Sequence, residues 1–203
     1  MKSREVTEVG SIRWRKFSTL MKTELQKMLD GELYDASDEQ LTAMRLNARQ
    51  LLHQYNQLTA ASRESKMAIL QQLLGRCSNA NIEPPFYCDY GRHILVGENF
   101  YMNFNCVILD CALVTIGDNV QFGPSVQIYT AYHPLKASER IKGPELAGPI
   151  VIGDNVWIGG GAIICPNVTI GQNTTIGAGS VVTRSVPEGV FAAGNPCRVI
   201  KAI

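Results

Sequence analysis

The sequence lacks the features that mark membrane-spanning, secreted and strongly charged proteins. Its 203 residues contain no apolar stretch near the roughly 18–20 residues that a membrane span needs. The basic start, residues 1–16, is not followed by an apolar segment, so we expect a flexible leader over 1–20 rather than a secretory signal. A net charge of +1 does not indicate binding to nucleic acid or to a membrane surface. We therefore expect a cytoplasmic protein of one domain plus an accessory element.

Cysteine and histidine are too few and too irregularly spaced to indicate a metal site. The six cysteines show no CxxC or CxH spacing, and without a signal segment they are expected to be buried free thiols rather than disulfides. The three histidines, His53, His93 and His133, have no coil-related spacing, and the sequence has no other histidine to complete a zinc ligand set. We therefore predict that the protein needs no metal. A Gly-x-Ser-x-Gly nucleophile elbow is also missing.

What the sequence does contain is a short repeat. Gly-x-Asn tripeptides follow an aliphatic residue at 97–99, 117–119, 153–155 and 171–173, with spacings of 20, 36 and 18 residues. Aliphatic residues also return at every sixth position, as in the series Ile152, Ile158, Ile164, Ile170, Ile176 and Val182. A six-residue period within an eighteen-residue period indicates a coil with three similar sides, and Gly or Asn suits its tight corners. The pattern predicts a mainly β protein, with a parallel β-helix over 81–203.

The repeat is interrupted at two places. It gains two residues between Ile108 and Ile116, and it disappears for 24 residues between Ile128 and Ile152. The second gap equals four six-residue units, so the phase is kept across it. We therefore predict about five coils beginning near Val96, with a charged, Pro- and Gly-rich loop at 130–149 that protrudes from an otherwise intact helix. Long loops of this kind are usually functional or disordered.

Residues 21–80 carry helical signals. The stretch Ser37-Asp38-Glu39-Gln40 predicts a capping box with Ser37 as the N-cap of a helix. A second helix is expected from about Ser62 to a stop at Gly75, and a short one over 21–29. The apolar stripes of these helices should pack together and onto the β-helix.

His133 is the one histidine placed as a catalytic base would be. It stands where the coil pattern ends and the 130–149 loop begins. A neutral imidazole near pH 7 can accept a proton from a hydroxyl group. On position alone, an ordinary surface histidine is an equally good interpretation.

Several stretches resemble the maltose and galactoside O-acetyltransferases, a family of hexapeptide-repeat acyltransferases. The resemblance covers about residues 22–203 and lies in the segments 99–105, 129–134, 152–160 and 194–198, while 28–36 is similar to the maltose acetyltransferases in particular. It implies a left-handed parallel β-helix. It also implies a homotrimer in which acetyl-CoA and the acceptor meet between neighbouring subunits.

The resemblance implies a role for particular residues. His133 matches the catalytic base, and Asn103 matches a residue that contacts the acceptor and helps to organise the reacting centre. Other positions of the acceptor pocket correspond to Asp35, Asp89, Tyr101 and Glu145. For acetyl-CoA, the matching positions are the backbone of Gly160 and Ala178 along the pantetheine arm, and Thr183, Arg184, Arg198 and Lys201 at the adenine-phosphate end.

Two positions qualify the resemblance. Next to Asp110, where galactoside enzymes carry a second acidic residue, this chain has Cys111, which favours a maltose-like acceptor. Trp157 either lines a channel for the thioester or is buried at a face between subunits.

The leading hypothesis is direct acetyl transfer from acetyl-CoA to a hydroxyl of a maltose- or glucose-like sugar, with an oxyanion held by the Gly160 N–H. The alternatives are acetylation of an antibiotic hydroxyl by the same fold, and a non-catalytic trimeric scaffold.

Overall fold

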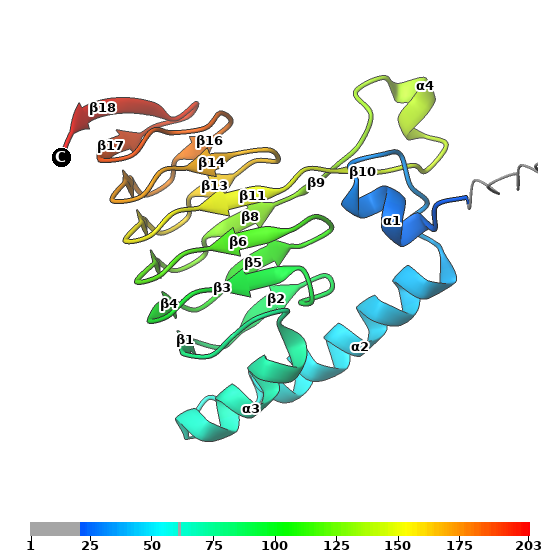
Figure 1. The fold of residues 1–203 in the computed structure, drawn as a ribbon, viewed down its shortest axis with the longest axis horizontal. Helices are drawn as coiled ribbons and strands as arrows, with labels where there is room; N and C mark the ends of the chain where they lie inside the picture. The colour runs from blue at the N-terminus through cyan, green and yellow to red at the C-terminus, as the bar shows by residue number, and fades with distance from the viewer. Residues whose placement is uncertain (1–20, 61) are drawn as a thin grey trace, which may run out of the picture.

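The computed structural model describes residues 21–60 and 62–203, so the leader expected at 1–20 lies outside the described residues. Three helices precede the strands: α1 (Glu24–Leu29), α2 (Glu39–Asn56) and α3 (Arg63–Leu73). Figure 1 shows α2 and α3 side by side at the end of the solenoid that holds the first strand. No helix in the described part of the chain is long and apolar enough to cross a membrane.

The helix starts follow side-chain caps. Ser62 caps α3 as predicted, and α1 begins after a capping box at Thr23 rather than at Met21. The prediction that Ser37 caps α2 was wrong, because the Ser37 N–H and hydroxyl donate to the Asp35 carboxylate (2.8 and 2.7 Å). The cap is Asp38, whose Oδ1 accepts the backbone N–H of Leu41 at 3.2 Å.

The rest of the chain winds as a parallel β-helix with three faces. The first face is β1 (Ala80–Ile82), β4 (Phe100–Met102), β7 (Gln121–Phe122), β12 (Trp157–Ile158), β15 (Thr175–Ile176) and β17 (Val190–Ala193), closed by antiparallel β18 (Arg198–Ala202). The second is β2 (Phe86–Cys88), β5 (Cys106–Leu109), β8 (Gln127–Tyr129), β13 (Ile163–Ile164) and β16 (Val181–Val182). The third is β3 (Ile94–Val96), β6 (Val114–Ile116), β11 (Ile150–Ile152) and β14 (Thr169–Ile170).

The solenoid is longer than the repeat predicted. It has about six turns instead of about five, and it begins at β1 rather than near Val96. The first turn escaped the pattern because eight residues, not six, separate the inward side chains of Cys88 and Val96.

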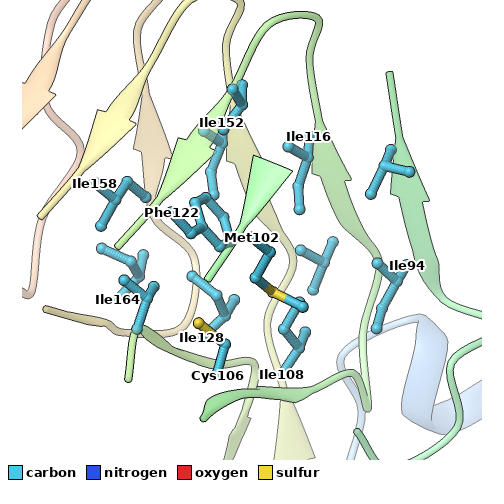
Figure 2. Close-up of a cluster of buried hydrophobic side chains, with 14 of the residues drawn as sticks. Ile94, Met102, Cys106, Ile108, Ile116, Phe122, Ile128, Ile152, Ile158 and Ile164 are labelled. Atoms are coloured by element: carbon cyan, nitrogen blue, oxygen red, sulfur yellow. The ribbon is translucent and has the colours of Figure 1, made fainter. Parts of the chain in front are cut away.

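The core of the solenoid is a stack of the aliphatic side chains of the repeat. Figure 2 shows Ile116, Phe122, Ile128, Ile152 and Ile158 pointing into this interior from strands of all three faces. All six members of the series from Ile152 to Val182 are at most 1% exposed, which confirms the inward face that the repeat predicted. Burying an aliphatic side chain of this size contributes about 1.5–3 kcal/mol, so the stack is a main source of stability.

The predicted Gly-x-Asn corners are confirmed as tight turns. Asn99, Asn119, Asn155 and Asn173 all have positive φ, between 56 and 58°. Their side chains form a ladder, with each amide nitrogen donating to the amide oxygen of the next turn at 2.9–3.1 Å. The ladder satisfies these side chains while the left-handed backbone turns the corner.

The segment 130–149, which we call the arm, leaves the solenoid between β8 and β11. Because β8 lies on the second face and β11 on the third, the helix continues in phase across it, as predicted. The arm is more ordered than a plain loop: β9 (Ala131–Tyr132) pairs antiparallel with β10 (Leu146–Ala147), and α4 (Ala137–Arg140) lies between them. Figure 1 shows the arm extending away from the solenoid beside α1.

All six cysteines are free. Cys88, Cys106 and Cys111 are buried, and the other three are half-buried. Burial raises the pKa of the buried thiols, which keeps them protonated near neutral pH.

Candidate functional site

Three successive turns carry extra residues where the second face passes to the third, and we call this edge the insertion corner. Eight residues separate the inward side chains of Cys88 and Val96, eight separate Ile108 and Ile116, and the arm occupies the same corner of the following turn. The three insertions carry, in order, Asp89 and Tyr90, Asp110 and Cys111, and His133 and Glu145. Side chains far apart in the sequence are thereby placed in adjacent layers.

A cavity of about 440 Å³, the corner cavity, opens between the insertion corner, the arm and α2. His133, Asp89 and Glu145, three of the predicted site residues, all line it. The other lining residues are Ala36, Arg45, Arg49, Tyr90, Leu109, Cys111, Ala131 and Tyr132. Its size and its convergent polar groups suit a small polar ligand.

His133 directly follows β9, and its side chain is exposed. Its ring has no hydrogen-bond partner within residues 21–60 and 62–203. Both ring nitrogens are therefore available to a ligand in the corner cavity, which is what a general base requires.

Glu145 is held in place by the segment before α2. The buried Tyr34 hydroxyl donates to Glu145 Oε2 at 2.8 Å, and the backbones of the two residues exchange hydrogen bonds at 3.1 Å in both directions. Burial raises the pKa of Tyr34 above its ordinary value, so the hydroxyl stays protonated as a donor. Tyr34 thus ties the arm, and with it Glu145, to the rest of the molecule.

Asp89 and Cys111 line the corner cavity and contact each other. Cys111 Sγ donates to Asp89 Oδ2 at 3.5 Å. Burial raises the pKa of both groups, which keeps the thiol protonated. Position 111, next to Asp110, thus presents a thiol to the cavity, and the carboxylate beside that thiol comes from Asp89, one turn earlier.

Asp110 is fully buried and does not line the cavity. Its carboxylate accepts the backbone N–H groups of Asp89 (3.0 Å), Tyr90 (2.8 Å) and His93 (3.3 Å). Burial raises the pKa of Asp110 to about 7. Its structural effect is to hold the insertion that carries Asp89.

Sequence reasoning missed the two arginines of α2. Arg45 donates to the Tyr90 hydroxyl (2.7 Å) and to the Ala36 carbonyl (2.6 Å), so it joins α2 to the insertion corner. Arg49, one helical turn later, is exposed on the cavity wall. Their four-residue spacing places both on one side of a predicted helix, but no sequence signal places that side against residues 89–90.

The remaining predicted acceptor residues do not line the corner cavity. Asp35 lines an adjacent cavity of about 630 Å³ that shares Ala36, and hydrogen bonds from Ser37 lower the pKa of Asp35. Tyr101 is in β4 on the first face, where it lines a separate cavity of about 460 Å³. Asn103 follows β4, and its Oδ1 accepts the Phe104 N–H at 2.8 Å. A single chain therefore brings only part of the predicted site together.

The predicted donor residues lie on the later turns. The N–H groups of Gly160 and Ala178 have no hydrogen-bond partner in the described part of the chain and occupy equivalent turns one layer apart. A Cβ on Gly159 would come within 2.5 Å of the Ala178 nitrogen, so the close stacking of these turns requires glycine there. Trp157 on β12 is 55% exposed. The predicted contacts to the adenine-phosphate end are all exposed: Thr183, Arg184, Arg198 and Lys201.

Among residues 21–60 and 62–203, no group of three or more His, Cys, Asp or Glu side chains is arranged to hold a metal ion.

Comparisons with known proteins agree with this architecture. Residues 27–78 match the maltose acetyltransferase hexapeptide capping motif, and 149–184 match the bacterial transferase hexapeptide (six repeats). The galactoside O-acetyltransferase of Escherichia coli is 41% identical over 88% of both chains.

Two solved structures are similar over nearly the whole described chain. A maltose O-acetyltransferase from Clostridium difficile is 50% identical with a TM-score of 0.88, covering 90% of this chain and 98% of that one. A galactoside acetyltransferase in complex with coenzyme A is 40% identical with a TM-score of 0.87, covering 90% and 92%.

Proposed function

The chain belongs to the galactoside and maltose O-acetyltransferase family, and from that premise we propose that it transfers the acetyl group of acetyl-CoA to a hydroxyl of a maltose- or glucose-like sugar. One observation carries the proposal. The corner cavity combines the exposed imidazole of His133 with the carboxylates of Asp89 and Glu145 and the guanidinium of Arg49. These groups suit an uncharged acceptor that is rich in hydroxyls.

In the proposed reaction His133 accepts the proton of the acceptor hydroxyl while its oxygen attacks the thioester carbonyl. Asp89 and Glu145 accept hydrogen bonds from other hydroxyls of the sugar and orient it. The Gly160 N–H donates to the oxyanion that forms on the carbonyl. The carbon–sulfur bond then breaks, and the proton passes from His133 to the departing thiolate, so no covalent enzyme intermediate is needed.

The proposed binding of acetyl-CoA is supported by backbone N–H groups and exposed cations on the later turns of the solenoid. Backbone N–H groups at Gly160 and Ala178 fit the amide oxygens of a pantetheine arm. Exposed cations at Arg184, Arg198 and Lys201 fit the phosphates of the nucleotide end. Because these groups, Tyr101 and Asn103 do not line the corner cavity, we propose a homotrimer in which a neighbouring subunit completes the site.

The test is the variant His133→Ala, assayed by CoA release with glucose and maltose as acceptors. Turnover should fall by roughly 10²–10⁴-fold, the usual cost of losing a general base, while acetyl-CoA binding measured by calorimetry should persist. Ser138→Ala, another exposed position on the arm, is the matched control and should keep full activity.

Near-normal turnover in folded His133→Ala would remove this residue from the mechanism. Activity of the native protein with an antibiotic alcohol but with neither sugar would favour the xenobiotic alternative. No CoA release with any acceptor would favour the scaffold.

A further inference from the structure

A second cavity of about 370 Å³ adjoins the corner cavity. It is lined by Leu52, His53, Asn56, Gln57, Tyr87 and Cys88, together with Arg49 and Asp89. Arg49 and Asp89 also line the corner cavity. The two cavities therefore adjoin each other at Arg49 and Asp89, and we call them together the groove, which leads away from His133.

The walls of the groove follow from two regular elements. Arg45, Arg49 and His53 recur at four-residue steps on α2, so they lie along one side of the helix at intervals of about 6 Å. Tyr87 lies in β2 and Asp89 directly follows this strand, and both residues line the second cavity. The groove therefore runs between α2 and the edge of the first turn.

Asn56 fixes the spacing of these two walls. Its amide nitrogen donates to the Phe86 carbonyl and its amide oxygen accepts the Phe86 N–H, both at 3.0 Å. The groove is therefore pre-formed by a reciprocal pair of hydrogen bonds, which reduces the ordering cost of binding.

The groups at the far end of the groove are left unused by the proposed reaction. The Tyr87 side chain is 51% exposed and offers a flat ring with a hydroxyl at its tip. His53 and Gln57 are also exposed and supply further donors and acceptors. This mixture of an aromatic ring and polar side chains suits a ligand with hydroxyls on its edges and apolar ring faces.

We propose that the groove is an extended acceptor site for a neutral oligosaccharide of two or more linked sugars. The terminal sugar occupies the corner cavity beside His133, and the next sugar lies over Tyr87 and contacts His53 and Gln57. This inference rests on the proposed function and adds a chain-length preference to it.

The test compares acceptors of different length in one assay. Values of kcat/KM are measured for glucose and N-acetylglucosamine and for maltotriose, cellotriose and triacetylchitotriose, in the native protein and in Tyr87→Ala, Tyr87→Phe and His53→Ala. The matched control is Gln50→Ala, because Gln50 is exposed on α2 and lines neither cavity.

The native protein should prefer its best trisaccharide over the matching monosaccharide. Tyr87→Ala should reduce that preference by roughly three- to tenfold, the worth of one aromatic contact. Tyr87→Phe should retain most of it, His53→Ala should reduce it, and Gln50→Ala should leave it unchanged. A native protein that prefers no trisaccharide, or a loss in Tyr87→Ala that is equal for both lengths, would overturn the extended site.

Failure of the proposed function would be visible separately, as absence of acetylation for every sugar. In that case calorimetric titration of the same trisaccharides decides on the groove. Binding that weakens in Tyr87→Ala but not in Gln50→Ala supports it, and absence of binding overturns it.

Discussion

Asp110 is a residue whose charge near neutral pH depends on folding. Its ordinary pKa of 3.8 rises to about 7 in the folded protein, chiefly because the carboxyl is buried. The folded state thus holds a proton that the unfolded state has already lost. The Asp110 contribution to the free energy of unfolding is therefore greatest below pH 4 and falls as the pH rises from about 4 to 7.

The variant Asp110→Asn tests this, because an amide does not titrate and still keeps one oxygen acceptor. We expect the stability of the native protein, minus that of the variant, to fall from about pH 4 to 7 in urea unfolding. Parallel pH profiles for the two proteins would show that Asp110 does not titrate in this range.

Arg184 and Arg198 are predicted to bind the phosphates of acetyl-CoA through charge-assisted contacts. Replacing either one with Ala should raise the KM for acetyl-CoA and change kcat little, since such binding is uniform along the reaction. Acetyl-pantetheine, which lacks the nucleotide, is the control and should be insensitive to both changes. Equal losses with the two donors would assign the arginines a structural role instead.

Among the elements, the corners of the solenoid offer the clearest test of backbone strain. Asn119 has a φ of 56°, and its side chain bonds to Asn99 and Asn155. Asn119→Ala should lower the free energy of unfolding by about 1–2 kcal/mol, because alanine is strained in the left-handed region and cannot join the ladder.

Asn119→Gly is the companion variant, since glycine adopts this conformation without strain. It should cost less than Asn119→Ala, as measured by the urea midpoint. A glycine variant that is less stable than the alanine variant would assign the effect to flexibility rather than to backbone angle.

The strands of the later turns could be predicted because the same requirements recur at every sixth residue and at every corner. Each of Ile152, Ile158 and Ile164 must point inward, and each Gly-x-Asn must turn a corner, so the sequence itself carries the period. The hand of the coil leaves no such periodic trace and was implied by the family alone. Ser37 was assigned wrongly because the choice between Ser37 and Asp38 as cap depends on a competing hydrogen bond to Asp35.

The site was less predictable than the fold because it combines distant insertions. The two extra residues between Ile108 and Ile116 were visible in the sequence, but their corner is known only once each strand is assigned to a face. Arg49 reaches the site through the packing of α2, which no local pattern encodes. The pairing of β9 with β10 was also missed, because two-residue strands have no periodicity.

At the scale of the whole molecule, the single chain exposes large apolar side chains along the solenoid. Phe104, Leu113, Val151 and Trp157 are between 41 and 55% exposed. A protein in solution tends to bury such surface, so we expect a trimer with closed cyclic symmetry. Light scattering at micromolar concentration is the measurement, and a stable monomer with full activity would contradict both the trimer and the shared site.

A mixing experiment makes the shared site more specific. His133→Ala and Asn103→Ala should each be inactive, yet co-refolding the two should restore part of the activity if one subunit supplies His133 and its neighbour supplies Asn103. Co-refolding His133→Ala with itself is the control. No recovery in verified mixed trimers would place both residues in the same half of the site.

Because the repeat keeps its phase across the arm, a residue's position along the solenoid axis and its position around that axis can be changed separately. Inserting eighteen residues adds one full turn, which moves the following turns by one layer, about 4.8 Å, along the axis. Each corner of those turns stays on the same side of the solenoid. An insertion confined to one corner extends sideways and raises nothing. The acceptor groups lie on the first turns of the solenoid and the exposed cations on its last turns. The distance between them therefore changes only by whole turns, and duplicating one turn would lengthen it while leaving both ends unchanged.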